Sequence, residues 1–115
     1  MTKSPSPFAQ QVYRLTSQVP AGRVTTYKQI GQALGTKAYR AIGQVLRCNP
    51  YAPAVPCHRV VSSDGSLGGF RGSRTKTALA DKIGLLEVEG VRIADQSVVD
   101  FYEVLFSFPD EINSA

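Results

Sequence analysis

The sequence is poor in the residues that build metal sites and disulfide frameworks, with two cysteines and one histidine among 115 residues. Two cysteines are too few for a structural zinc site, which usually takes four ligands. No apolar run reaches the roughly 18 to 20 residues needed to span a bilayer, and residues 1–7 lack the apolar core of a signal peptide. We therefore expect an intracellular protein, cytoplasmic in a prokaryote or nuclear in a eukaryote. A disulfide between Cys48 and Cys57 is disfavoured there, so at least one cysteine is free for chemistry or is part of the core.

The formal net charge is +4, and it is unevenly distributed along the chain. A basic protein favours a polyanionic partner without requiring one. Five of the nine acidic residues lie between residues 95 and 111, whereas six arginines lie between residues 23 and 74. This distribution predicts one DNA-facing surface. The six are Arg23, Arg40, Arg47, Arg59, Arg71 and Arg74.

Hydrophobic spacing predicts a single small α+β domain over residues 7–108, between a flexible N-terminal tail (1–6) and a C-terminal tail (109–115). Apolar residues at three- to four-residue intervals and turn residues at the ends predict helices over 7–19, 26–34, 37–47 and 75–89. Residues 57–61 have the pattern of a short buried strand, and residues 91–108 that of a strand or hairpin. The segment around 68–72 is a glycine-rich loop.

The second and third of these helices, joined by a short turn with Gly35, have the pattern of a helix-turn-helix unit. Gly43 in the middle of the third helix costs about 1 kcal/mol relative to alanine, which suggests close approach of another surface. A solvated basic face, with a glycine that packs against a neighbour, is the alternative interpretation. The exposed side of this helix carries Tyr39, Arg40, Gln44 and Arg47.

The most informative stretch is Pro56-Cys57-His58-Arg59-Val60. The thiolate is the reactive form of cysteine, and an adjacent histidine or positive charge lowers the pKa of a thiol. Because neighbouring side chains of a strand point to opposite faces, contact between Cys57 and His58 needs a bend or a bridging water. By chemistry alone, Cys57 is either a nucleophile or a buried structural cysteine.

This stretch resembles the signature of the O6-alkylguanine-DNA alkyltransferases, also called methylated-DNA–protein-cysteine methyltransferases. Further similarities follow in order over residues 8 to 92. Residues 20–27 resemble that family's approach to its helix-turn-helix, residues 40–45 its recognition helix, Asn49-Pro50 its hinge, and residues 85–90 its closing helix. The resemblance implies a winged helix-turn-helix-like unit and direct repair by single-turnover alkyl transfer, without metal or cofactor. It also implies a monomer that binds duplex DNA containing O6-alkylguanine through the minor groove.

The resemblance also implies a role for each matched residue. Cys57 is the alkyl acceptor, His58 its base, Glu89 the carboxylate that orients His58, and Tyr27 the proton donor to guanine. Arg40 fills the gap left by a flipped base. The DNA contacts further include Thr26, Tyr39, Gly43, Gln44 and Arg47; the base pocket and hinge include Asn49, Val55, Pro56, Arg59 and Phe70.

Several alternatives stay open at this point. Tyr27 is equally suited to a place in the core, and Arg40 is equally suited to a phosphate contact. Asn49 before a proline is also a simple helix terminator. Glu87 competes with Glu89 for the role of the carboxylate that orients His58. Phe70 stands where many members of the family have tyrosine, and the segment 72–82 is several residues longer than usual. The short length also resembles the alkyltransferase-like proteins, which lack the cysteine, bind alkylated DNA and recruit excision repair. A plain helix-turn-helix regulator is the third interpretation.

Overall fold

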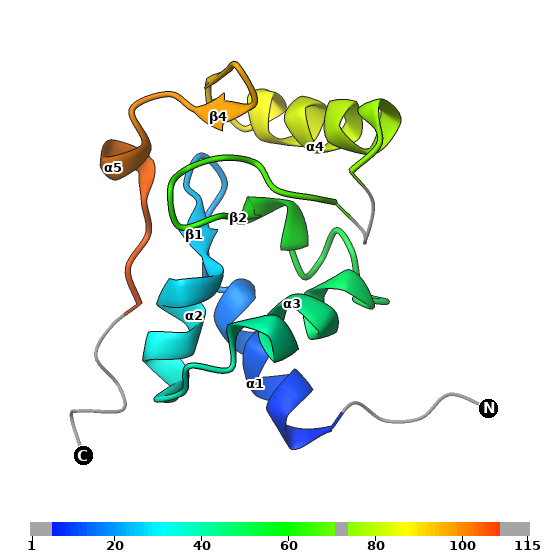
Figure 1. The fold of residues 1–115 in the computed structure, drawn as a ribbon, viewed down its shortest axis with the longest axis vertical. Helices are drawn as coiled ribbons and strands as arrows, with labels where there is room; N and C mark the ends of the chain where they lie inside the picture. Colours follow the sequence, from blue (N-terminus) through cyan, green and yellow to red (C-terminus); the bar gives the residue numbers. More distant parts are fainter. Residues whose placement is uncertain (1–5, 71–73, 109–115) are drawn as a thin grey trace.

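The structure is a computed structural model that describes residues 6–70 and 74–108. Most of both predicted tails, and Arg71 and Gly72 of the predicted glycine-rich loop, lie outside the described residues. Within the described ranges, no helix has the length and apolar character required to cross a membrane. In Figure 1 the helices of residues 7–47 lie together in one half of the molecule, and the helix of residues 76–88 lies beside the hairpin in the other half.

The described part of the chain contains ten helices and strands, and the α+β class predicted from the sequence is confirmed. Two strand pairs form separate two-stranded sheets, β1 with β2 in parallel and β3 with β4 antiparallel. In chain order the elements are α1 (Pro7–Thr16), β1 (Thr25–Thr26), α2 (Tyr27–Leu34), α3 (Tyr39–Arg47), the 3-10 helix η1 (Cys57–Arg59), β2 (Val60–Val61), α4 (Lys76–Val88), β3 (Ile93–Ala94), β4 (Ser97–Val98) and α5 (Phe101–Val104).

The first helix begins where the sequence predicts and ends earlier. Ser6, assigned to the tail from sequence, caps α1 by accepting a hydrogen bond from the Ala9 amide, and Pro7 follows at the first helical position. The helix ends at Thr16 and not at Val19, because the next amides bond carbonyls three residues back in a tighter turn. Val19 is nevertheless buried, so its apolar character reflects burial beyond the helix end.

Helices α2 and α3 form the predicted helix-turn-helix. Thr26 caps α2 through a hydrogen bond from the Gln29 amide, and Gly35 ends it in the left-handed conformation at φ 73°. The two helices then pack so closely that a Cβ on Gly31 would lie 2.5 Å from the Tyr39 ring. Only glycine therefore fits at position 31, and this contact sets the approach of α3 to α2.

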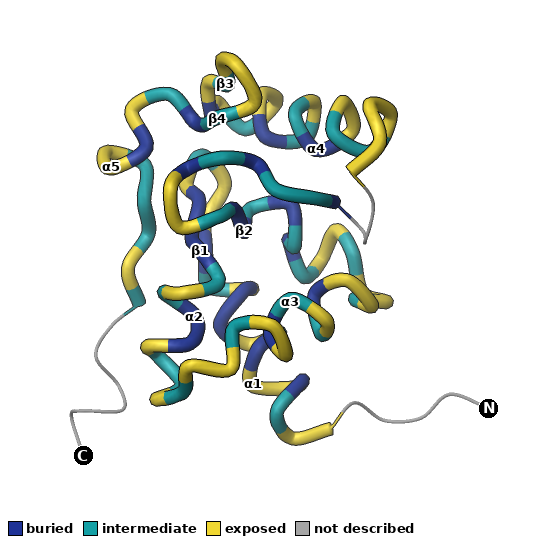
Figure 2. Tube along the Cα trace, in the orientation of Figure 1, coloured by how far each residue is buried: buried dark blue, intermediate teal, exposed yellow. Residues whose placement is uncertain are grey.

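The β1–β2 pair connects the two halves of the molecule. Val60 packs with the core of the helical half, which includes Ile30 and Ile42, whereas Val61 packs with Val24 and Leu86 in the other half. This division follows from the alternation of side chains along a strand. Figure 2 shows the buried segments of both halves converging on this pair.

The predicted strand over 57–61 is correct only for Val60–Val61. Residues 57–59 form η1, because the Cys57 amide bonds the Val55 carbonyl and the Arg59 amide bonds the Pro56 carbonyl. These local bonds turn the backbone immediately before β2. The turn supplies the bend that the sequence required near Cys57 and His58.

The C-terminal part contains one element that the sequence did not predict. The β3–β4 pair is the predicted hairpin, but Phe101–Val104 forms the helix α5. Phe101 is buried against the core that also contains Leu67 and Val98. A four-residue helix has too little periodicity to be recognised in a sequence.

Candidate active site between the recognition helix and the cysteine loop

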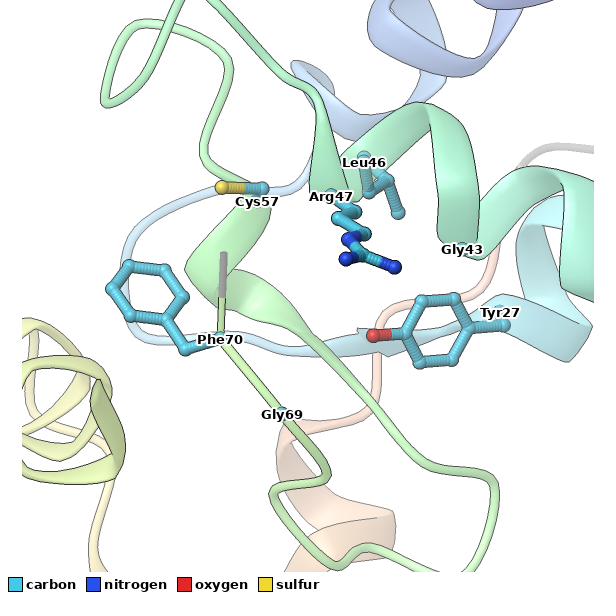
Figure 3. Close-up of a pocket in the computed structure, with 7 residues that line it drawn as sticks. All are labelled: Tyr27, Gly43, Leu46, Arg47, Cys57, Gly69 and Phe70. Atoms are coloured by element: carbon cyan, nitrogen blue, oxygen red, sulfur yellow. The ribbon is translucent and has the colours of Figure 1, made fainter. Parts of the chain in front are cut away.

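A pocket of about 150 Å³ opens between the helix-turn-helix and the segment that carries Cys57. Tyr27 contributes from the start of α2, and Phe70 from the loop that follows β2. In Figure 3 the Tyr27 hydroxyl is directed toward the interior of the pocket, opposite Cys57 and Phe70. The complete lining is Tyr27, Gly43, Leu46, Arg47, Cys57, Gly69 and Phe70.

Cys57 occupies the first position of η1, is half-buried and is one of the residues that line the pocket. The loop before it is held by Asn49, whose side-chain amide donates to the Val55 carbonyl at 2.8 Å. The Asn49 side-chain oxygen also accepts the Tyr51 amide at 2.9 Å. These two hydrogen bonds to the backbone fix the loop between α3 and Cys57.

Behind Cys57, a buried histidine is tied to a carboxylate. His58 is 3% exposed, and its Nε2 lies 3.0 Å from Oε2 of Glu89. Arg59 donates two hydrogen bonds to the same carboxylate, from Nε to Oε1 at 2.9 Å and from a terminal nitrogen to Oε2 at 2.6 Å. It is therefore Glu89 that contacts His58, whereas Glu87 is exposed.

The same arrangement determines the protonation of His58. Burial lowers the pKa of His58, against the raising effect of Glu89, and the charges of Arg59 and Lys82 lower it further. Burial opposes ionisation of Glu89, but hydrogen bonds from Arg59 and His58 bring its pKa below the usual value. A neutral imidazole that donates from Nε2 to a carboxylate keeps Nδ1 as an acceptor. His58 is thereby arranged as a base.

Tyr27 stands on the far side of the pocket from the histidine cluster. Burial raises the pKa of the Tyr27 hydroxyl, and the charge of Cys57 raises it further, while Arg74 has the opposite effect. The hydroxyl therefore stays protonated at neutral pH. A protonated phenol directed into a pocket is able to donate a proton to a leaving group.

The predicted DNA-contacting residues divide into two groups. Arg40, Gln44 and Arg47 are exposed on α3, and Arg47 reaches the pocket. By contrast, Tyr39 is half-buried against the helical core, where its ring fills the space above Gly31. Thr26 is 3% exposed and its hydroxyl caps α2, so the structure gives it a capping position in place of an exposed one.

The pocket differs in part from the lining expected from sequence. Tyr27 and Phe70 line it, but Val55 and Pro56 are not among its lining residues. The Val55 carbonyl instead accepts bonds from Asn49 and from the Cys57 amide, which shapes the loop. Sequence reasoning also missed Leu46 and Gly69 of the lining.

Lys82 was missed as well, although it is 1% exposed and donates three hydrogen bonds near the pocket. A signal for it was present. Lys82 interrupts the apolar face formed by Leu79, Ile83 and Leu86 on one side of α4. A lysine in such a position is expected to be buried and partnered.

Fold and pocket together define a class of protein, a helix-turn-helix domain with a cysteine-containing pocket between its second helix and the following loop. The family model described as "6-O-methylguanine DNA methyltransferase, DNA binding domain" matches residues 7–91. The chain belongs to this family, and the resemblance noted in the sequence is confirmed.

Named relatives agree with this assignment. The methylated-DNA--protein-cysteine methyltransferase of Saccharolobus solfataricus is 43% identical over 89 residues, which are 77% of this chain and 54% of that protein. The protein of the same name from Thermococcus kodakarensis is 43% identical over 88 residues, 76% of this chain and 47% of that protein. The chain thus spans about half the length of these relatives.

Solved structures show the same fold. The crystal structure of Mycobacterium tuberculosis OGT in complex with DNA matches with a TM-score of 0.66 at 33% identity, over 75% of this chain and 51% of that one. Schizosaccharomyces pombe Atl1, solved with damaged DNA containing O6-carboxymethylguanine, matches with a TM-score of 0.75. Atl1 is 24% identical, over 92% of this chain and 100% of that one, so this second similarity concerns the fold alone.

Proposed function

We propose that this protein repairs alkylated DNA directly, by a single-turnover transfer of an alkyl group from O6 of guanine in duplex DNA to Cys57. One observation carries the proposal: Cys57 borders a pocket next to His58, which is held by a carboxylate that Arg59 binds with two hydrogen bonds. A nucleophile, a base and a group that orients the base are the parts that nucleophilic catalysis needs.

The chemical steps follow from these positions. His58 Nδ1 takes the proton of the Cys57 thiol through a bridging water, and the thiolate attacks the alkyl carbon in line. A carbon–sulfur bond forms as the bond from carbon to O6 breaks, and the bonding electrons go to guanine. Tyr27 gives its hydroxyl proton to the guanine as it leaves. The thioether is stable and no group that could regenerate the thiol is apparent among the residues that the structure describes, so each molecule reacts once.

Base flipping is a necessary part of this proposal. The O6 substituent lies within the base stack, where a thiolate cannot approach it in line, and extrusion costs a few kcal/mol. The exposed Arg40 on α3 is suited to fill the vacated space, with Gln44 and Arg47 beside it on the same helix. By the family resemblance, α3 enters the minor groove, where inserted side chains commonly kink the duplex.

Replacement of Arg40 by alanine tests this role. We expect Arg40→Ala to slow repair of O6-methylguanine in duplex DNA, because the flipped state loses its support. Reaction with the free alkylated base needs no flipping, so its rate should stay near that of the unchanged protein. Single-turnover rates on both substrates measure the difference, and equal slowing of both contradicts the role.

The direct test of repair is the amount of unmodified guanine restored in a duplex oligonucleotide that contains O6-methylguanine. We expect one guanine restored per protein molecule, none with Cys57→Ser, and full restoration with Cys48→Ser. Because Cys48 is exposed, that control separates Cys57 from general thiol reactivity. Restoration well above one per protein would contradict the single turnover.

A second candidate function is lesion recognition without transfer. Atl1, which was solved with damaged DNA containing O6-carboxymethylguanine, shares the fold over 92% of this chain and the whole of that protein. Under this alternative, the protein binds the alkylated duplex tightly, restores no guanine and recruits excision-repair proteins. The restoration assay combined with a binding measurement on the same duplex distinguishes the two.

A further inference from the structure

Lys82 is a buried charge that the steps above do not use. It lies on the inner face of α4 and is 1% exposed, between Leu79, Ile83 and Leu86 on the apolar side of the helix. Figure 1 shows α4 lying over the segment that leads from β2 toward residue 70. A buried ammonium group is costly unless hydrogen bonds compensate it, so its contacts define its role.

Three backbone carbonyls receive the three hydrogen bonds of Lys82. Nζ donates to Val60 at 2.8 Å, to Leu67 at 2.7 Å and to Gly69 at 3.1 Å. An ammonium group has three N–H donors and a neutral amine has two, so the complete set needs the charged form. Lys82 thus uses its full donor capacity on the backbone.

These carbonyls belong to two segments that each lead to a part of the pocket lining. Val60 directly follows η1, which begins with Cys57. Gly69 and the adjacent Phe70 line the other part. One side chain therefore ties the segment that follows the nucleophile to the loop that carries Gly69 and Phe70.

The charge of Lys82 also acts on the pocket. Burial lowers the pKa of Lys82 to about 8, and the charge of Cys57 has the opposite, raising effect. Lys82 in turn lowers the pKa of His58, while Glu89 faces His58 and Arg59. At neutral pH Lys82 therefore remains mainly protonated.

We propose that Lys82 is a positioning residue for alkyl transfer: its ammonium fixes both backbone segments around the pocket and places a positive charge within electrostatic reach of the Cys57 side chain. This inference rests on the function proposed above. Lys82 neither gives nor takes a proton in the reaction, and the bonds made and broken stay the same. A lysine that only completed the core would leave the pH dependence of Cys57 unchanged.

The test compares Lys82→Met with Lys76→Met, both in a Cys48→Ser protein. Methionine keeps the length of lysine and removes the charge, and Lys76 is exposed on the same helix. The rate of Cys57 alkylation by iodoacetamide is followed against pH. We expect its midpoint to rise by about one pH unit in Lys82→Met, since a nearby opposite charge has effects of that order, and to stay unchanged in Lys76→Met.

Methyl transfer from the O6-methylguanine duplex is the second readout for these variants. At neutral pH we expect Lys82→Met to be slower by about tenfold, the loss of thiolate that one unit implies, and Lys82→Arg to recover part of the rate. Identical iodoacetamide profiles and transfer rates in Lys82→Met and Lys76→Met overturn the inference. If the Cys48→Ser protein itself transfers no methyl, the proposed function fails, and the iodoacetamide profiles still decide the electrostatic role of Lys82.

A measurement that keeps Lys82 covers the case in which Lys82→Met does not fold. The side-chain nitrogen of Lys82 is titrated by NMR in the Cys48→Ser protein, before and after methyl methanethiosulfonate converts Cys57 to a neutral mixed disulfide with release of methanesulfinate. We expect the Lys82 midpoint to fall once the thiolate is removed, because the coupling is reciprocal. An unchanged midpoint overturns the inference.

Discussion

At the scale of single residues, Glu89 makes the connections on which the candidate site depends. Its carboxylate is hydrogen-bonded to the His58 ring and accepts two hydrogen bonds from the Arg59 guanidinium. The Glu89 side chain therefore orients His58 and is itself held in place by Arg59. Arg59 also donates to the Val19 carbonyl at 2.7 Å. The cluster therefore connects the end of α4 to the segment after α1.

The family resemblance implied Glu89 and its pairing with His58, but not its pairing with Arg59. The family resemblance pointed to Glu89, while Glu87 remained a competitor because the segment before α4 is longer than usual. Nothing in the sequence indicated the two hydrogen bonds from Arg59 to Glu89, because residues 30 positions apart come into contact only through the fold. Lys82 carried a signal in its apolar face, but nothing indicated which carbonyls it would contact.

Replacement of Glu89 tests the orienting role. We expect Glu89→Gln to slow methyl transfer at neutral pH by about ten- to a hundredfold, because His58 loses the charge that fixes its tautomer. The single-turnover rate on the O6-methylguanine duplex measures the effect. Glu87→Gln is the matched control, as Glu87 is exposed on the same helix end. Equal rates in the two variants would show that His58 does not depend on Glu89.

At the scale of elements, amphipathic spacing and end signals located four of the helices, because a buried face and a cap are local in sequence. Thr26, Gly35 and Thr75 mark helix ends where the sequence predicts them. The 3-10 helix η1 and the helix α5 were missed, since each is too short for periodicity. Both depend on tertiary contacts, such as the packing of Phe101 in the core.

Gly43 gives a prediction that belongs to α3. A Cβ at Gly43 would lie 4.0 Å from the Tyr27 ring, an ordinary contact, so the free protein has room for alanine. We expect Gly43→Ala to raise the free energy of unfolding by about 1 kcal/mol through helix propensity and to slow methyl transfer several-fold, because the methyl enters the pocket. Urea unfolding and single-turnover rates measure the two effects.

The control for Gly43 is Gly84 in α4, where a Cβ would meet no atom within 4 Å. Gly84→Ala should bring a similar gain in stability with an unchanged transfer rate. If Gly43→Ala transfers as fast as Gly84→Ala, close approach at α3 does not explain the glycine.

At the scale of the whole molecule, the site lies where two cores meet. Val60 and Val61 belong to different clusters, one with the helix-turn-helix and one with α4. The pocket takes Tyr27 and Arg47 from the first part and Phe70 from the loop beneath α4. The composition of the chain indicated one basic surface, but the position of the pocket between the two core clusters could be seen only in the structure.

Acid pH should destabilise the fold as a whole. Burial, foremost, lowers the pKa of His58 from 6.5, and its hydrogen-bonded partner Glu89 lies below 4.5. Both groups bind fewer protons folded than unfolded, so their contribution is present above the unfolded pKa and is lost as pH falls through the folded value. The free energy of unfolding should therefore decrease from about pH 6.5 downward.

Urea unfolding at a series of pH values measures this decrease. His58 is the only histidine in the chain, so His58→Gln should flatten the curve between about pH 6.5 and 4.5. A curve for the unchanged protein that is level or rises toward acid pH in this interval would contradict the protonation assigned to His58.

The most direct test of the account is the intact mass of the protein after incubation with a duplex containing O6-methylguanine. The account predicts a gain of one methyl group, mapped by peptide analysis to Cys57 and absent from Cys57→Ser. No gain in mass, with tight binding to the same duplex, would contradict it and would make the protein a lesion-recognition protein with an unreactive cysteine.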